Sequence, residues 1–249
     1  MAYYFASDVH LGLSYRGDEP RERETRFVAW LEAIRPDCEG LFLVGDIFDF
    51  WFEYRRVIPK GFVRVLGTLA SFCDSGIPVH FFVGNHDLWV SDYFAREIGM
   101  TVHTTPATFE LCGRTLFVAH GDGLGKSGDW KYALLRRIFH SRCLRRIVSA
   151  VLHPNVMMRF GHWWSSHNRH GRITGVAHTF RGEEEPIVRF ARVYLAEHPD
   201  TDYLVFGHLH TPIVYRMNVR SSVVVLGEWM EHPMYGRLDA DGEMELRPF

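Results

Sequence analysis

The sequence has few cysteines, and their spacing suits neither a disulfide framework nor a zinc knuckle. Cys38, Cys73, Cys112 and Cys143 lie far apart and form no Cys-x-x-Cys pair. Disulfide scaffolds and structural zinc sites need cysteines at short, paired spacings. We therefore expect a protein of a reducing compartment.

Long apolar runs and a large net charge are also missing. No apolar run reaches the roughly 18–20 residues of a membrane span. The N-terminus shows no cationic stretch followed by an apolar one, so we expect no signal peptide. The net charge of −2 over 249 residues gives no global signal for a polyanion partner. With 47% hydrophobic residues, the chain predicts one large domain, or one domain with an insertion.

The charge that is present is unevenly distributed. Residues 126–181 hold eleven Lys and Arg and one acid, a local balance of +10 that leaves −12 on the rest. A basic segment in an otherwise acidic protein indicates a surface for an anionic partner. The alternative is an ordinary solvated helix face.

Five short polar motifs, in a fixed order, each follow an apolar run that is rich in β-formers. They are Asp8-Val9-His10, Gly45-Asp46, Gly84-Asn85-His86-Asp87, His120-Gly121-Asp122 and Gly207-His208-Leu209-His210. The preceding runs are 3–6, 41–44, 79–83, 116–119 and 203–206. Open α/β sheets bind ligands at the carboxyl ends of their strands. The motifs therefore predict one site, although a lone Asp-x-His is more often a turn with a surface histidine.

The segments between the motifs predict a layered α/β fold. Apolar residues at helical spacing indicate helices over 22–34, 62–75, 92–98 and 184–198. The first hundred residues thus run β-α-β-α-β. Segments 213–218, 222–226, 234–238 and 244–246 alternate like a β-meander. We expect a two-sheet α/β sandwich of residues 1–122 and 181–249, with residues 123–180 inserted as a helical cap over the site.

The residue types in the motifs suit divalent metal ions. Residues i and i+2 of an extended chain face the same way, so Asp8 and His10 can reach one ion, and His208 and His210 repeat this spacing. Mixed oxygen and imidazole ligands suit Mn²⁺, Fe²⁺ or Zn²⁺. A carboxylate such as Asp46 can bridge two ions ~3.5–4 Å apart, as in two-metal phosphoryl-transfer sites. Asn85 offers a neutral oxygen.

In this order the motifs resemble those of the calcineurin-like metallophosphoesterases: DxH, GDxxD, GNHD or GNHE, a later His, and GHxH. The resemblance covers residues 3 to about 122 and about 200 to 227. It implies an αββα sandwich with two divalent metals, Mn²⁺ first, with Fe²⁺, Zn²⁺ or Mg²⁺ as alternatives. One metal would be held by Asp8, His10, Asp46 and His210, and the other by Asp46, Asn85, His120 and His208. His86 would stabilise or protonate the leaving-group oxygen, with Asp87 orienting its ring.

Within that family the chain resembles the UDP-2,3-diacylglucosamine hydrolases of lipid A biosynthesis. The resemblance rests on the sequence GDIFDFW at 45–51, on the insertion after His120-Gly121-Asp122, and on the pair Asp129 and Tyr132. It implies cleavage of the substrate pyrophosphate to UMP and 2,3-diacylglucosamine 1-phosphate. The enzyme would be cytoplasmic and peripheral on the inner face of the cytoplasmic membrane.

The cap offers candidate substrate contacts. Head-group contacts are expected from Lys126, Asp129, Tyr132, Arg136 and Arg137. A pyrophosphate or an anionic membrane surface would attract Arg142, Arg145 and Arg146. An acyl-chain channel would be lined by Met157, Met158, Phe160, Trp163 and Trp164. Ordinary packing and solvation are the alternatives for these side chains.

Two departures from the hydrolase group leave a second substrate class open. This chain has His86 where well-known members have Arg, and GHLH where they usually have GHTH. The alternative is a metal-dependent phosphodiesterase or phosphomonoesterase acting on a soluble nucleotide or another phosphoester. An inactive binding scaffold is disfavoured because all seven expected ligands are present. A nucleic-acid substrate is not expected, since a nuclease would need a wider groove.

Overall fold

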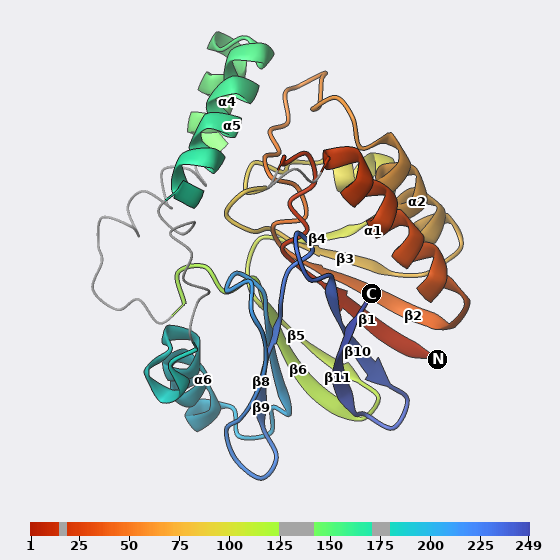
Figure 1. The fold of residues 1–249 in the computed structure, drawn as a ribbon, viewed down its shortest axis with the longest axis vertical. Helices are drawn as coiled ribbons and strands as arrows, with labels where there is room; N and C mark the ends of the chain where they lie inside the picture. The colour runs from red at the N-terminus through yellow and green to blue at the C-terminus, as the bar shows by residue number, and fades with distance from the viewer. Residues whose placement is uncertain (15–18, 125–141, 171–179) are drawn as a thin grey trace.

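Two β-sheets pack face to face in the computed structural model, which describes residues 1–14, 19–124, 142–170 and 180–249 (Figure 1). The first sheet has the strand order β11-β10-β1-β2-β3-β4. Its strands are β1 (Ala2–Ala6), β2 (Cys38–Val44), β3 (Val79–Phe82), β4 (Thr101–His103), β10 (Met234–Asp239) and β11 (Met244–Pro248). Strands β1 to β4 pair in parallel, and β10 and β11 continue the sheet antiparallel.

Helices make the crossovers that parallel neighbours require. They are α1 (Pro20–Ile34), followed by the 3₁₀ turn η1 (Arg35–Asp37), then α2 (Val63–Asp74) and η2 (Phe94–Ile98). The expected short helix over 92–98 is a π-helical turn over Phe94–Ile98, ended by Gly99 at φ +91°. The two longer helices are confirmed to within two residues at each end.

The second sheet has the order β5-β6-β7-β9-β8. Its strands are β5 (Ala107–Leu111), β6 (Arg114–Ala119), β7 (Tyr203–Phe206), β8 (Pro212–Arg216) and β9 (Ser222–Leu226). Strands β6, β7 and β9 are parallel. Before β7 the chain forms the 3₁₀ turn η3 (Gly182–Glu184) and α6 (Pro186–Glu197).

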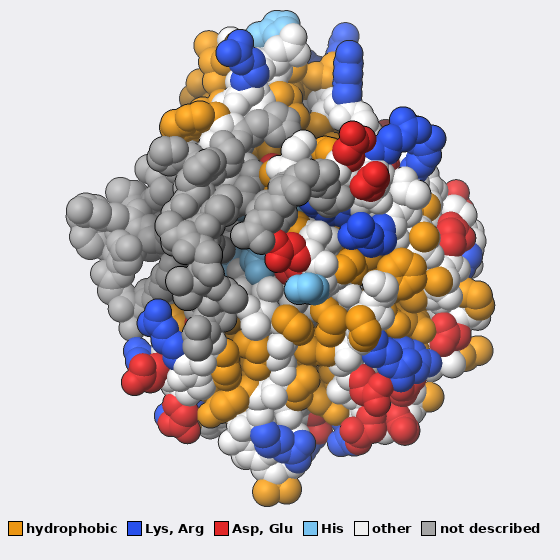
Figure 2. Space-filling view, viewed as in Figure 1, with side chains coloured by type: hydrophobic (Ala, Val, Ile, Leu, Met, Phe, Trp, Pro, Cys, Tyr) orange, Lys and Arg blue, Asp and Glu red, His pale blue; other side chains and the backbone are white. Residues whose placement is uncertain are grey.

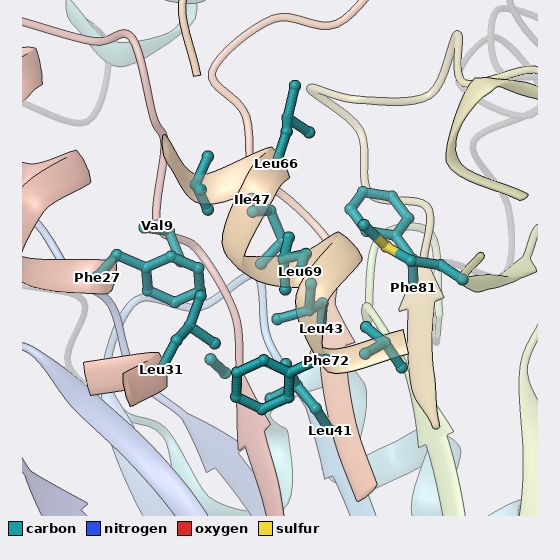
Figure 3. Close-up of a cluster of buried hydrophobic side chains, with 14 of the residues drawn as sticks. Val9, Phe27, Leu31, Leu41, Leu43, Ile47, Leu66, Leu69, Phe72 and Phe81 are labelled. Atoms are coloured by element: carbon teal, nitrogen blue, oxygen red, sulfur yellow. The ribbon is translucent and has the colours of Figure 1, made fainter. Parts of the chain in front are cut away.

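Three apolar layers hold the sandwich together. Phe5, Phe42 and Val118 belong to the layer between the sheets. Helices α1 and α2 cover the outer face of the first sheet, where Phe27 of α1 and Leu69 of α2 join the strand cluster (Figure 3). Helix α6 covers the outer face of the second sheet (Figure 1). The expected αββα sandwich is confirmed.

The predicted C-terminal β-meander is wrong. Strands β8 and β9 form a hairpin in the second sheet, whereas β10 and β11 form a hairpin in the first. All five residues of β9 are buried, because β9 lies between β7 and β8. An apolar run without alternation is typical of such an inner strand, and this should have separated β9 from the half-exposed strands after it.

Two described helices lie beyond the carboxyl ends of the strands (Figure 1). They are α4 (Arg142–Val151) and α5 (Pro154–His170), and α5 starts at Pro154. Met157 of α5 packs with Phe50, Phe52 and Trp89 of the core. The domain division at 123–180 stays a prediction. Among the described residues, no helix has both the length and the apolar character needed to traverse a bilayer.

Candidate metal centre

The loops after five strands converge at one end of the sandwich. Asp8, His10, Asp46 and His120 are almost fully buried. Asn85, His86, His208 and His210 are partly buried. The motifs bond to one another: the Asp8 carboxylate accepts from the His208 amide at 2.8 Å, and the Asp46 carboxylate accepts from the His86 amide at 2.8 Å. The sequence motifs therefore form one site.

One cluster contains Asp8, His10 and His210. Their potential ligand atoms all lie within 4.8 Å of one another. The Asp8 Oδ1 atom is 3.3 Å from His210 Nε2 and 3.9 Å from His10 Nε2. The His10 and His210 rings are stacked, with their centroids 5.1 Å apart. One carboxylate and two imidazoles thus face a common point.

A second cluster contains Asp46, His120 and His208, whose ligand atoms also lie within 4.8 Å of one another. His120 Nδ1 lies 2.9 Å from the Val44 carbonyl, which can only accept, so this nitrogen carries a proton. His120 Nε2 is 3.3 Å from both Asp46 Oδ2 and Asn85 Oδ1. Fixing one imidazole nitrogen with a carbonyl and directing the other at acceptors is the usual arrangement of metal-binding histidines.

The donor set fits divalent cations. Among the described residues, Asp8 Oδ1 and both ring nitrogens of His10 are buried without a hydrogen-bond partner. Buried polar atoms without partners are costly, and a cation would satisfy them. Oxygen and imidazole donors accept Mn²⁺, Fe²⁺ and Zn²⁺ alike.

The charges within the site depend on one another. Burial raises the pKa of Asp8 to about 6. Burial also works to raise the pKa of Asp46, but the adjacent His120 and His86 hold it well below its usual range. Burial opposes protonation of His120, yet the Asp46 charge raises the His120 pKa well above the usual value. A cation here would compete with the second proton of His120, which the Asp46 charge favours.

The backbone at the site is held in an uncommon conformation. Asp8, His10, Asp46, His208 and His210 all have φ between 50° and 68°. Such left-handed conformations cost a non-glycine residue roughly 1 kcal/mol or more, and they persist where surrounding structure enforces them. They cluster at functional sites, which agrees with the ligand chemistry here.

His86 lies beside Asp49, a residue to which the motif analysis gave no role. His86 Nδ1 is 3.0 Å from the Asp49 carbonyl oxygen and 3.8 Å from Asp49 Oδ1. The carbonyl can only accept, so Nδ1 carries the proton and Nε2 is the atom that can exchange one. The second Asp of the GDxxD spacing was the sequence signal for this residue.

The expected contact between Asp87 and the His86 ring is wrong. Asp87 accepts instead from the backbone amides of Gly84, at 2.7 Å, and Ile47, at 2.9 Å. Its carboxylate is fully buried and connects the third motif, at Gly84, to the second motif, at Ile47. Asp87 supports the backbone of the site, and the ring contact belongs to Asp49.

A residue of α5 that the sequence did not single out also reaches this point. The Ser165 hydroxyl of α5 donates to Asp49 Oδ1 at 2.7 Å and lies 3.3 Å from His86 Nδ1. No short-range pattern marks this serine, because only the fold brings α5 against the GDxxD loop.

The other cap predictions have mixed outcomes. Lys126, Asp129, Tyr132, Arg136 and Arg137 lie outside the described residues. Arg142, Arg145 and Arg146 are on α4, and Trp164 is on α5. Met157 is buried and Met158 packs beside it, whereas Phe160 and Trp163 are exposed. These four described side chains therefore do not line a single surface.

Comparison with known proteins agrees with this geometry. Residues 1–212 match the sequence profile of the calcineurin-like phosphoesterases. The chain belongs to the calcineurin-like phosphoesterase family. As a member of that family it is a metal-dependent hydrolase of phosphoric esters.

Curated relatives match this phosphoesterase over nearly its full length. A UDP-2,3-diacylglucosamine hydrolase of Porphyromonas gingivalis is 36% identical, covering 95% of this chain and 93% of the relative. One of Hahella chejuensis is 28% identical, covering 97% and 95%. A dimetal phosphatase of Danio rerio shares the fold, with a TM-score of 0.53 at 13% identity, covering 100% of this chain and 95% of that structure.

Proposed function

We propose that this phosphoesterase hydrolyses the pyrophosphate of UDP-2,3-diacylglucosamine to UMP and 2,3-diacylglucosamine 1-phosphate. The observation that carries the proposal is the full-length similarity to relatives named for that substrate, at up to 36% identity. The two clusters of potential metal ligands supply a site suited to phosphorus chemistry.

The proposed ligand sets follow the two clusters. Asp8, His10 and His210 would hold one ion, and Asn85, His120 and His208 the other, with Asp46 shared between them. Mn²⁺ is the proposed ion. Bound metals of this kind polarise phosphoryl oxygens and supply a nucleophile at neutral pH. The residues fix the ligand atoms in place and keep the inner ligands away from bulk water.

His86 is proposed to donate a proton to the leaving-group oxygen from Nε2. The Asp49 carbonyl holds the proton on Nδ1, so the exchangeable position is the opposite nitrogen. Burial lowers the pKa of His86, and the nearby carboxylates of Asp46 and Asp49 counter that effect. The net shift of the His86 pKa is still downward, so protonation of the ring would depend on the charge of a bound anionic substrate.

Substrate contacts by Lys126, Asp129, Tyr132, Arg136 and Arg137 are part of the same proposal. An aspartate and a tyrosine at i and i+3 of a helix share one face. The cationic side chains suit a pyrophosphate.

We further propose that α4 and α5 contact the inner face of the cytoplasmic membrane. Residues 142–170 contain five arginines and no acid. We call α4, α5 and the residues between them the α4–α5 hairpin. Its exposed apolar side chains are Ile147, Val151, Leu152, Val156, Phe160 and Trp163. Figure 2 shows apolar side chains gathered at the top of the view, where Figure 1 places these helices. Basic and apolar groups together favour an anionic lipid surface.

Sedimentation with vesicles tests the membrane contact. Binding should be stronger to anionic than to zwitterionic vesicles, and the double change Phe160→Ser and Trp163→Ser should weaken it roughly tenfold. Val219→Ser, which alters an exposed residue outside the hairpin, is the matched control. Equal sedimentation of all three proteins would contradict the contact.

The substrate is tested by UMP release. Purified protein with Mn²⁺ is given UDP-2,3-diacylglucosamine in mixed micelles, beside bis-p-nitrophenyl phosphate. Fast UMP release with slow turnover of the artificial ester supports the proposal. Turnover of the artificial ester without UMP release would reject this substrate and favour a soluble phosphoester, for which His86 in place of the usual arginine is the supporting observation.

A further inference from the structure

One face of helix α5 packs against residues 49–52, which follow Asp46 in the chain. Met157, Gly161 and Ser165 are four residues apart, so they lie on one face of the helix. All three are buried. Met157 packs in the cluster of Phe50, Phe52 and Trp89. A Cβ atom on Gly161 would lie 2.3 Å from the Phe50 ring, so the α5 backbone rests directly on that ring.

At one end of this helix face, Ser165 lies beside His86, the proposed proton donor. Ser165 is fully buried, and its hydroxyl gives its single proton to Asp49 Oδ1 at 2.7 Å. The same oxygen lies 3.3 Å from His86 Nδ1. A hydroxyl can accept while it donates, so Ser165 can share the Nδ1 proton of His86 with the Asp49 carbonyl.

The Asp49 carboxylate is the centre of this network. Its Oδ1 atom receives the Ser165 proton and lies 3.5 Å from His10 Nδ1. The His10 and His86 rings meet edge to face, with their centroids 4.8 Å apart. Loss of the serine hydroxyl would remove one hydrogen bond from Asp49 Oδ1 and one contact from His86 Nδ1, which would loosen the orientation of the His86 ring.

We propose that Ser165 is a positioning residue, which sets the orientation of the His86 ring through Asp49 and thereby couples the docking of α5 to leaving-group protonation. This proposal rests on the proton-donor role proposed above for His86. It does not depend on the identity of the lipid substrate. No covalent step is assigned to Ser165.

Two esters with different leaving groups distinguish a positioning role from a purely structural one, because a structural role would affect both esters equally. A p-nitrophenolate leaves without help, whereas a phenolate needs a proton. For Ser165→Ala we expect kcat to fall roughly tenfold on diphenyl phosphate and less than about twofold on bis-p-nitrophenyl phosphate, with KM nearly unchanged. Ser165→Cys keeps a weaker donor, so its kcat on diphenyl phosphate should lie between those of the wild type and Ser165→Ala. Ser75→Ala, which removes an exposed hydroxyl from the end of α2, is the matched control.

Two further measurements separate the possible causes. Gly161→Ala keeps the hydroxyl but forces α5 away from Phe50, and it should show the same dependence on the leaving group. Long-range ¹H–¹⁵N NMR of the Zn²⁺-loaded protein should show the His86 proton on Nδ1 in both proteins, with faster exchange with solvent in Ser165→Ala than in the wild type.

The outcomes divide clearly. Equal losses on both esters, or a raised KM alone, would overturn the proposal, because they indicate docking or substrate contact. Ser165→Ala behaving like Ser75→Ala would overturn it as well. His86→Asn serves as the reference: equal losses on both esters in that variant would mean that the proton-donor role of His86 is wrong, and the NMR result would then decide on Ser165 by itself.

Discussion

Three glycines of the motifs leave space for a proposed metal-binding side chain that belongs to another motif. A Cβ atom at Gly45 would lie 2.4 Å from the His120 ring, at Gly84 it would lie 2.2 Å from Asp46 Oδ1, and at Gly207 it would lie 2.6 Å from Asp8 Oδ2. The glycines thus have a packing role across the site, beyond the freedom they give to each turn.

Gly84→Ala should therefore damage the site more than the fold. Because the new methyl group would displace the Asp46 carboxylate, kcat is expected to fall at least about a hundredfold, with bound metal reduced. Gly67→Ala is the control, since Gly67 lies within α2 with nothing within 4 Å of its Cβ position. That variant should keep full activity and gain roughly 0.5–1 kcal/mol in unfolding free energy. Equal activity of the two variants would contradict this account.

Asp46→Ala tests the shared ligand. If Asp46 serves both ions, the variant should lose both metals in elemental analysis and at least about a hundredfold in turnover. Retained turnover, or loss of a single ion, would contradict the bridging role.

At the scale of elements, strands β3 and β4 are joined by a histidine pair outside the site. His80 Nδ1 lies 3.0 Å from His103 Nε2, and the rings stack on Phe42 and Phe82. Burial, with a smaller effect of His103, lowers the pKa of His80 to about 4. The pair is thus neutral in the folded protein at neutral pH.

This pair predicts loss of stability in mild acid. The folded pKa lies below the unfolded value of 6.5, so the unfolded chain binds more protons between pH 6.5 and about 4. The stabilisation is fully present above pH 6.5 and is lost as the pH falls through that window. The free energy of unfolding is measured with urea at pH 7.5 and at pH 5.0. Its decrease between these two pH values should be roughly 1 kcal/mol smaller in His80→Gln than in the wild type, after allowance for partial exposure. Parallel losses would reject the assignment.

Element prediction from sequence succeeded where local pattern and burial agree. The strands before Asp8, Asp46 and His120 are apolar runs that end abruptly in polar residues, and the structure confirms each of them. The four C-terminal strands were predicted as one meander but divide between the two sheets, because pairing partners are a property of the whole fold. Asp49 was marked by the GDxxD spacing, whereas Ser165 reaches it only through the docking of α5, so no spacing rule could have revealed that serine.

At the scale of the whole molecule, the site joins the two sheets. Asp8, His10, Asp46 and Asn85 follow strands of the first sheet, while His120, His208 and His210 follow strands of the second. Ions bound to both groups would be lost on unfolding, so their binding energy would add to the stability of the sandwich.

Metal removal should therefore lower the melting temperature. Protein treated with EDTA is expected to melt lower than protein with Mn²⁺ at about a hundred times its dissociation constant, a difference worth about 2.7 kcal/mol. Calorimetry should show no such shift in Asp46→Ala. An unchanged melting temperature in the wild type would mean that the ions do not link the sheets.

The order of the ligands along the chain sets the order in which the enzyme can mature during synthesis. Six strands of the described core precede residue 124, yet His208 and His210 follow only after helices α4, α5 and α6 have been made. A nascent chain that ends before residue 203 carries five of the seven proposed ligands and lacks strand β7, which inserts between β6 and β9. If these residues are the ligands, the complete metal site can form only after the last motif has emerged from the ribosome.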